Sequence, residues 1–136
     1  MDARPTTAIP ETIAGFRGRS LESRIEESER VKTQYASRLP VIVTRSSSRS
    51  ARTLLGSSDL PALDKFKYLV PGDFTVGQLI YVIRRRMRVS PEVALFMYCG
   101  ATLPSSTTLI QELYSTQKDM DGFLYLTFQG ESSFGG

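Results

Sequence analysis

Few side chains in this 136-residue chain could carry out chemistry. The chain has no histidine and a single cysteine, Cys99. Histidine is the usual general base near neutral pH and the most common metal ligand. The sequence therefore excludes Ser–His and Cys–His nucleophile pairs and Cys/His zinc sites. Carboxylate or lysine catalysis remains formally open. Cys99 lies in the apolar run ALFMYC and is predicted to be a buried, inert thiol.

Basic residues gather in two places, although the formal net charge is only +3. One group lies in the Ser/Arg-rich segment 46–58 and just before it, which by composition is a loop, either a flexible insertion or a phosphorylatable segment. The other group is Arg84, Arg85, Arg86 and Arg88. It ends a predicted helix, where the helix dipole favours cations. Nucleic-acid or membrane-surface binding is the alternative, but no aromatic residues are interleaved with these arginines.

The elements that must position these residues follow from periodicity. Helices are predicted over 20–35 (Ser20 as the N-cap), over 73–87 (Asp73 or Thr75 as the cap) and over 107–118. Strands are predicted over 39–45, 65–71, 93–99 and 123–128, the last buried on both faces in the middle of a sheet. This order predicts an α+β fold with a four-stranded sheet and a helix packed on one face. A β-grasp is one such topology, and periodicity alone does not select it.

Both ends of the chain are predicted to be loose. Residues 1–15 contain two prolines and several small polar residues. Residues 131–136, ESSFGG, end in two glycines, which lose much backbone freedom on ordering. No apolar run approaches the roughly 20 residues that span a bilayer. Any membrane role must therefore come from a surface or an attached lipid.

Four stretches in succession resemble the autophagy ubiquitin-like modifiers, the autophagy-related protein eight family that includes GABARAP. They are SLESRIEESERVKTQYASRLPVIV, KYLVPGDFTVGQLIYVIRRRM, ALFMYCGATLP and LYSTQKDMDGFLYLTFQGESSFG. The resemblance covers about residues 16–135. It implies one ubiquitin-like β-grasp domain over 16–130, with a mixed sheet, a Ser/Arg-rich insertion at 46–58 and an N-terminal helical extension. The family's first short helix would fall near 11–19, where composition predicts loose chain.

The resemblance implies a protein tag and not an enzyme, and no cofactor. An autophagy cysteine protease would cut between Gly135 and Gly136, and Gly135 would then be joined, through activating and conjugating enzymes, to phosphatidylethanolamine. If Gly136 were the acceptor, no trimming would be needed. The tag would move from the cytoplasm to the autophagosome membrane.

The resemblance also implies two pockets beside the 67–70 strand, which is predicted to be a sheet edge. Cargo receptors and adaptors with aromatic-x-x-aliphatic motifs would add a strand there. The aromatic pocket would be formed by Glu27, Val31, Pro40, Ile42, Lys67, Leu69 and Phe123. The aliphatic pocket would be formed by Tyr68, Val70, Pro71, Phe74, Leu79 and Val82, with Arg86 on its rim. Strand alternation agrees, since it places Leu69 on one face and Tyr68 and Val70 on the other.

Each pocket residue also has a structural interpretation. Val31, Ile42 and Phe123 could belong to the core, and Lys67 could be an edge lysine that discourages aggregation. A non-conjugated adaptor that uses only the peptide groove is the main alternative function. A basic binder of nucleic acid or membrane is a further one.

Overall fold

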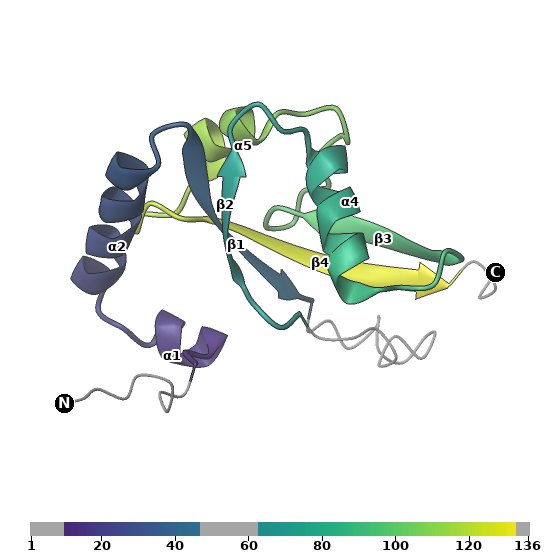
Figure 1. Ribbon diagram of the computed structural model, residues 1–136, viewed down its shortest axis with the longest axis horizontal. Coiled ribbons are helices and arrows are strands. Elements are labelled where there is room, and N and C mark those ends of the chain that lie inside the picture. The colour runs from purple at the N-terminus through teal and green to yellow at the C-terminus, as the bar shows by residue number, and fades with distance from the viewer. Residues whose placement is uncertain (1–9, 47–62, 133–136) are drawn as a thin grey trace.

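The computed structural model describes residues 10–46 and 63–132, and within these the side chains of 131 and 132 are left aside. Its elements are α1 (Ile13–Arg17), α2 (Leu21–Gln34), β1 (Arg38–Arg45), β2 (Lys67–Pro71), α4 (Val76–Met87), β3 (Val93–Tyr98), α5 (Ile110–Gln117) and β4 (Leu124–Ser132). The expectations for residues 1–9, for most of the Ser/Arg-rich segment and for 133–136 lie outside the described residues. Figure 1 shows these elements along the chain.

The four strands form one mixed sheet in the order β2-β1-β4-β3. β1 is antiparallel to β2 and parallel to β4, and β3 is antiparallel to β4. The last strand therefore lies beside the first in the middle of the sheet, and β2 is an edge strand. This pairing is the β-grasp arrangement, and it confirms both the predicted fold and the predicted edge.

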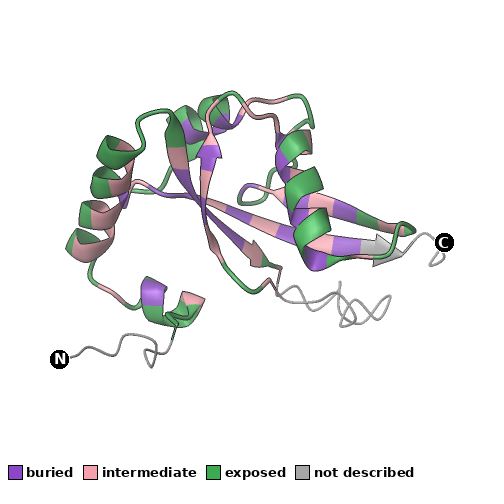
Figure 2. Ribbon diagram, in the orientation of Figure 1, coloured by how far each residue is buried: buried purple, intermediate pink, exposed green. Residues whose placement is uncertain are grey.

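The main core lies between one face of the sheet and the helices α4 and α5. Val41, Val43, Leu124 and Leu126 of the two central strands pack there with Leu79 and Ile83 of α4. Figure 2 shows buried residues along the central strands and on the inner sides of these helices. α4 begins at a capping box in which Thr75 Oγ1 accepts from the Gln78 N–H at 3.1 Å. Of the two predicted caps, Thr75 is the one used.

Pro40 lies in an inner strand, where a missing N–H is usually unfavourable. Pairing of β1 with β4 begins only at Val41↔Leu124. The missing N–H of Pro40 therefore falls before the neighbouring strand starts, close to the beginning of β1, as predicted.

Two expected boundaries were wrong. Chain that was predicted to be loose up to residue 15 is helical from Ile13, because the Thr12 hydroxyl caps α1 at Gly15 and Phe16 is buried. The final strand does not end at 128 but continues to Ser132, because β3 pairs with it as far as Val93↔Ser132. The first two residues of the expected tail, 131 and 132, are therefore part of the sheet.

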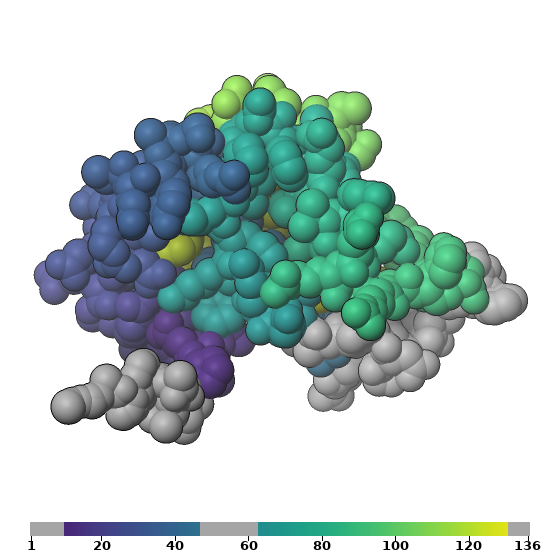
Figure 3. All heavy atoms as spheres, viewed as in Figure 1, coloured from purple at the N-terminus to yellow at the C-terminus, as the bar shows by residue number. Residues whose placement is uncertain are grey.

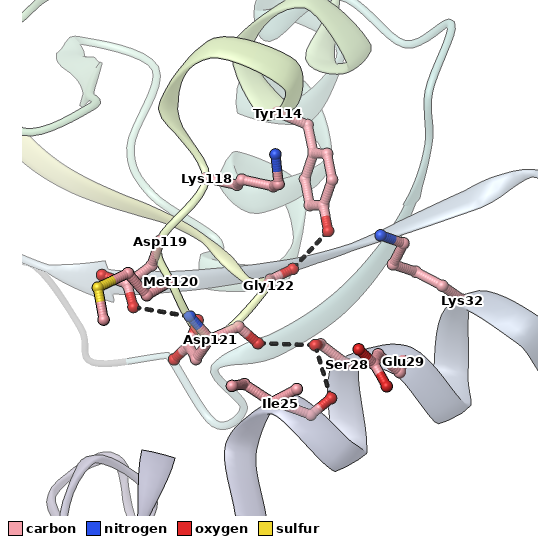
Figure 4. A pocket seen from close by; sticks show the side chains of 10 residues that line it. All are labelled: Ile25, Ser28, Glu29, Lys32, Tyr114, Lys118, Asp119, Met120, Asp121 and Gly122. Atoms are coloured by element: carbon pink, nitrogen blue, oxygen red, sulfur yellow. Dashed lines mark hydrogen bonds between the residues drawn. The ribbon is translucent and has the colours of Figure 1, made fainter. Parts of the chain in front are cut away.

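α2 is held against the start of β4 by hydrogen bonds, around a hollow of about 380 Å³ (Figure 4). Ser28 Oγ donates to the Asp121 carbonyl at 2.7 Å. Gly122 has φ +87°, and a Cβ there would lie 2.3 Å from Ser28 Oγ. A glycine is therefore required at this close approach of helix and strand.

Candidate functional site

The outer edge of β2, beside which the described ranges place no other strand, is the first part of the candidate site. Val43 N–H donates to the Phe66 carbonyl at 2.9 Å, so alternation directs the backbone of residues 66, 68 and 70 toward β1. The main-chain groups of Lys67 and Leu69 then face away from the sheet. On that side the Leu69 carbonyl accepts a hydrogen bond from Arg38 Nη1 at 3.3 Å. This edge offers backbone hydrogen bonds to an added strand.

The residues predicted for the aromatic pocket come together on the sheet face opposite the main core. The register pairs Ile42 with Lys67 and Pro40 with Leu69. Ile42 and Phe123 are buried at 1% and 2% exposure and pack together, so they could form only the floor of a pocket. Lys67 and Leu69 are half-buried on the neighbouring strand, and Glu27, which pairs with Lys67, and Val31 are half-buried on α2. In Figure 3, yellow atoms of the C-terminal part of the chain are visible at the bottom of a depression between α2, in blue, and β2, in teal.

Phe16 of α1 is a neighbour of this pocket that the sequence did not indicate. Its ring lies 5.1 Å from that of Phe123, in an edge-on arrangement, and 5.8 Å from that of Phe66. It also packs against Ile42 and is fully buried. One buried aromatic residue thus anchors α1 against two residues of the predicted aromatic pocket.

An ionic network surrounds the same residues. Lys67 Nζ lies 3.0 Å from Glu11 Oε1, 3.0 Å from Glu27 Oε2 and 4.8 Å from the centre of the Phe16 ring. Arg19, between α1 and α2, pairs with Glu27 and lies 3.2 Å from Glu11 Oε2 through Nε. The network therefore joins the segment before α1, the α1–α2 connection, α2 and the edge strand.

Glu27 is the acidic centre of this network. Burial alone would raise the pKa of its carboxyl group, but hydrogen bonds from Arg19 and Lys67, helped by their charges, lower the pKa below the usual value. Glu27 is therefore ionised at neutral pH and fixes both cations.

The residues predicted for the aliphatic pocket lie where β2 meets α4, and most belong to the main core. Tyr68, Val70 and Leu79 are buried at 8%, 3% and 2% exposure. Burial raises the pKa of Tyr68 to about 12, and its hydroxyl donates to the Lys65 carbonyl at 3.0 Å. Pro71 and Phe74 are half-buried and Val82 is 39% exposed, so these three residues are available for contact.

Arg86 lies at the predicted rim, where its Nε is 2.8 Å from Asp64 Oδ1. The hydrogen bond with Asp64 raises the pKa of Arg86. A hollow of about 470 Å³ continues from Phe74 and Val82 along α4 to the exposed Tyr81. The predicted alternation along β2 is confirmed: Tyr68 and Val70 face the main core, and Lys67 and Leu69 lie on the other face. Of the predicted aliphatic set, Phe74 and Val82 border a surface depression.

Three further expectations have different outcomes. Cys99 is buried, as predicted, and burial raises the pKa of its thiol. Gly135 and Gly136 lie outside the described residues. Within the described ranges, no helix is long and apolar enough to cross a membrane.

The two predicted pockets and the β2 edge between them are called the groove below. The fold defines a class of protein: a ubiquitin-like β-grasp domain with two helices added at its N-terminus. Residues 23–135 match the family described as Autophagy protein Atg8 ubiquitin like. The chain is 45% identical to Autophagy-related protein 8a of Arabidopsis thaliana over 115 residues, which is 85% of this chain and 87% of that protein. It is 44% identical to Autophagy-related protein 8 of Colletotrichum lindemuthianum over 115 residues, 85% of this chain and 88% of the relative.

A solved structure supports the same assignment. The crystal structure of Trypanosoma brucei ATG8 superposes with a TM-score of 0.75 at 33% identity, covering 90% of this chain and 97% of that one. The chain therefore belongs to the Atg8 family of ubiquitin-like autophagy proteins.

Proposed function

We propose that this chain is a modifier that becomes joined through a C-terminal glycine to phosphatidylethanolamine on autophagosomal membranes and there recruits partner proteins. The observation that supports partner recruitment is the open edge of β2, with a predicted pocket on each side of it. Family membership supports conjugation to the lipid. The partners would be cargo receptors and adaptors whose peptides contain an aromatic-x-x-aliphatic motif.

The conjugation chemistry requires only a glycine carboxylate from this chain. A cysteine protease hydrolyses the bond between Gly135 and Gly136, and an activating enzyme adenylates the new carboxylate. A conjugating-enzyme thiol displaces the adenylate to form a thioester. The amine of phosphatidylethanolamine then attacks the thioester carbonyl, which forms an amide and releases the thiol. Glycine suits this role because no side chain obstructs the narrow passages of these enzymes.

Conjugation is tested by incubating the full chain with family protease, activating and conjugating enzymes, ATP and phosphatidylethanolamine vesicles. Mass spectrometry should detect a product that has lost Gly136 and gained the phospholipid, and Gly135→Ala should abolish it. A product that retains Gly136 would move the acceptor by one residue. No adduct, in a reaction that conjugates another family member, would favour the non-conjugated adaptor.

Peptide binding is tested by calorimetry with a peptide that contains a Trp-x-x-Leu core. We expect micromolar affinity, on the order of −8 kcal/mol. Leu69→Ala should weaken it at least tenfold, because Leu69 is a half-buried side chain on the edge strand, opposite Pro40 and within the predicted aromatic pocket. Leu103→Ala, at a 52% exposed position outside the groove, is the matched control. Equal affinities for Leu69→Ala and the parent chain, with unchanged circular dichroism, would contradict the groove.

A further inference from the structure

The Glu11 carboxylate bridges two cations at one end of the groove. One oxygen lies 3.0 Å from Lys67 Nζ and the other lies 3.2 Å from Arg19 Nε. Glu11 itself is exposed, with 35% of its side chain accessible. Glu27 pairs with the same two cations and is more buried, at 14%. Glu11 is therefore the outer and more replaceable of the two acidic partners.

The contact between Glu11 and Arg19 is incomplete. Arg19 Nε is buried yet has no hydrogen bond of acceptable geometry in the described part of the chain. Its 3.2 Å approach to Glu11 Oε2 is thus an electrostatic contact without alignment. A buried donor left unsatisfied is unfavourable. A carboxylate that approached from another direction could satisfy this donor and still contact Lys67.

The direction of a bound peptide places an approaching side chain at this position. The aromatic pocket is built around residues 67 and 69, and the aliphatic pocket lies beside residues 70 and 71. A peptide whose aromatic residue precedes its aliphatic residue must therefore run parallel to β2. Its residues before the aromatic one would lie toward the start of β2, next to Lys67.

We propose that Glu11 is a competitor within the chain for this position, which rests on the groove function proposed above. The carboxylate of an acidic residue just before the aromatic residue of a partner peptide takes the place of Glu11 on Lys67 and Arg19. The segment before α1 thereby reduces the advantage that an acidic peptide would otherwise have. Phe16 stays buried during this exchange, so α1 remains docked while Lys67 and Arg19 release Glu11 and bind the peptide carboxylate.

The test compares two peptides and three proteins by calorimetry at low salt. The peptides differ only in the residue before the aromatic one, which is glutamate or alanine. The proteins are the full chain, Glu11→Gln and the control Glu22→Gln. Glu22 is an exposed glutamate in the first turn of α2, and the described residues provide no ion pair for it.

Glu11→Gln should tighten binding of the glutamate peptide at least threefold and change binding of the alanine peptide less than 1.5-fold. Glu22→Gln should leave both unchanged. The threefold gain should shrink as salt is raised, because exposed ion pairs are screened. Equal effects of Glu11→Gln on the two peptides, or no effect on either, would overturn the inference.

The two proposals fail in distinguishable ways. If the groove is not a peptide site, Leu69→Ala does not lower the affinity of the chain for either peptide. If only the competition is wrong, both peptides bind and depend on Leu69, but Glu11→Gln does not separate them.

Discussion

At the scale of single residues, Glu27 determines the electrostatics of the groove. It was predicted as a pocket residue, and the structure adds that it holds Arg19 and Lys67 together. The pairing is partly shielded from solvent, so it is weakened less by salt than an exposed pair. Part of the cost of burying the carboxylate is thus offset by two cations that come from different elements.

Glu27→Gln should remove part of the acid sensitivity of the fold. The pKa of Glu27 is lowered in the folded state, so as pH falls below about 4.3 the unfolded chain takes up a proton first. The stability that this group contributes is therefore present above the unfolded pKa and is lost as pH falls through the lower folded pKa. Chemical denaturation between pH 3 and pH 7 measures it.

The expected result is a shallower loss of unfolding free energy in acid for Glu27→Gln than for the parent chain. Glu29→Gln, on the exposed side of the same helix, is the control. Parallel curves for the parent chain and Glu27→Gln would show that the network contributes no pH dependence.

At the scale of elements, α1 depends on tertiary contacts. It has five residues, and isolated helices shorter than about 12 residues are marginal in water. Thr12 caps it through a 2.9 Å bond from the Gly15 N–H, and Phe16 is its only buried residue. Its position therefore rests on one aromatic side chain and the ionic network around Lys67.

Phe16→Ala should release α1 without unfolding the sheet. Truncating a buried phenylalanine costs about 3–5 kcal/mol where the structure cannot relax, but here the helix can detach instead. Hydrogen exchange should show the Gly18 amide, which donates to the Ala14 carbonyl, losing protection. The Val43 amide, bonded to the Phe66 carbonyl, should keep it.

Tyr81→Ala, at a 58% exposed aromatic residue, should leave both amides protected. Equal loss of protection at Gly18 and Val43 in Phe16→Ala would show that α1 is part of the cooperative core.

At the scale of the whole molecule, the sheet separates two hydrophobic clusters. The larger lies beneath α4 and α5, and the smaller joins Phe16, Ile42 and Phe123 on the other face. In Figure 1 the N-terminal helices lie at one end of the molecule, and the last described residues of β4 lie at the other. A membrane attached beyond that end of β4 would therefore leave the groove beside α2 accessible to partners.

Much of the fold followed from local patterns. The apolar stripe of α4 and its threonine cap are formed by residues close together in the sequence. The alternation of Tyr68, Leu69 and Val70 along β2 is equally local. Such signals survive in the sequence because neighbouring side chains must face the same core. They predicted the elements and the two faces of the edge strand, whereas the residue sets of the two pockets came only from the resemblance to the family.

The tertiary structure alone decided which remote groups meet. Lys67 and Glu11 are 56 positions apart, and the segment that carries Glu11 has no periodic pattern that would predict a docked helix. In the same way, β4 continues to Ser132 only because β3 provides backbone partners there. The sequence by itself determined the β-grasp elements and the family, since these depend on local periodicity and matching motifs. That Ile42 and Phe123 are buried beneath the predicted aromatic pocket, with Phe16 packed against them, depended on contacts between parts of the chain that are distant in sequence.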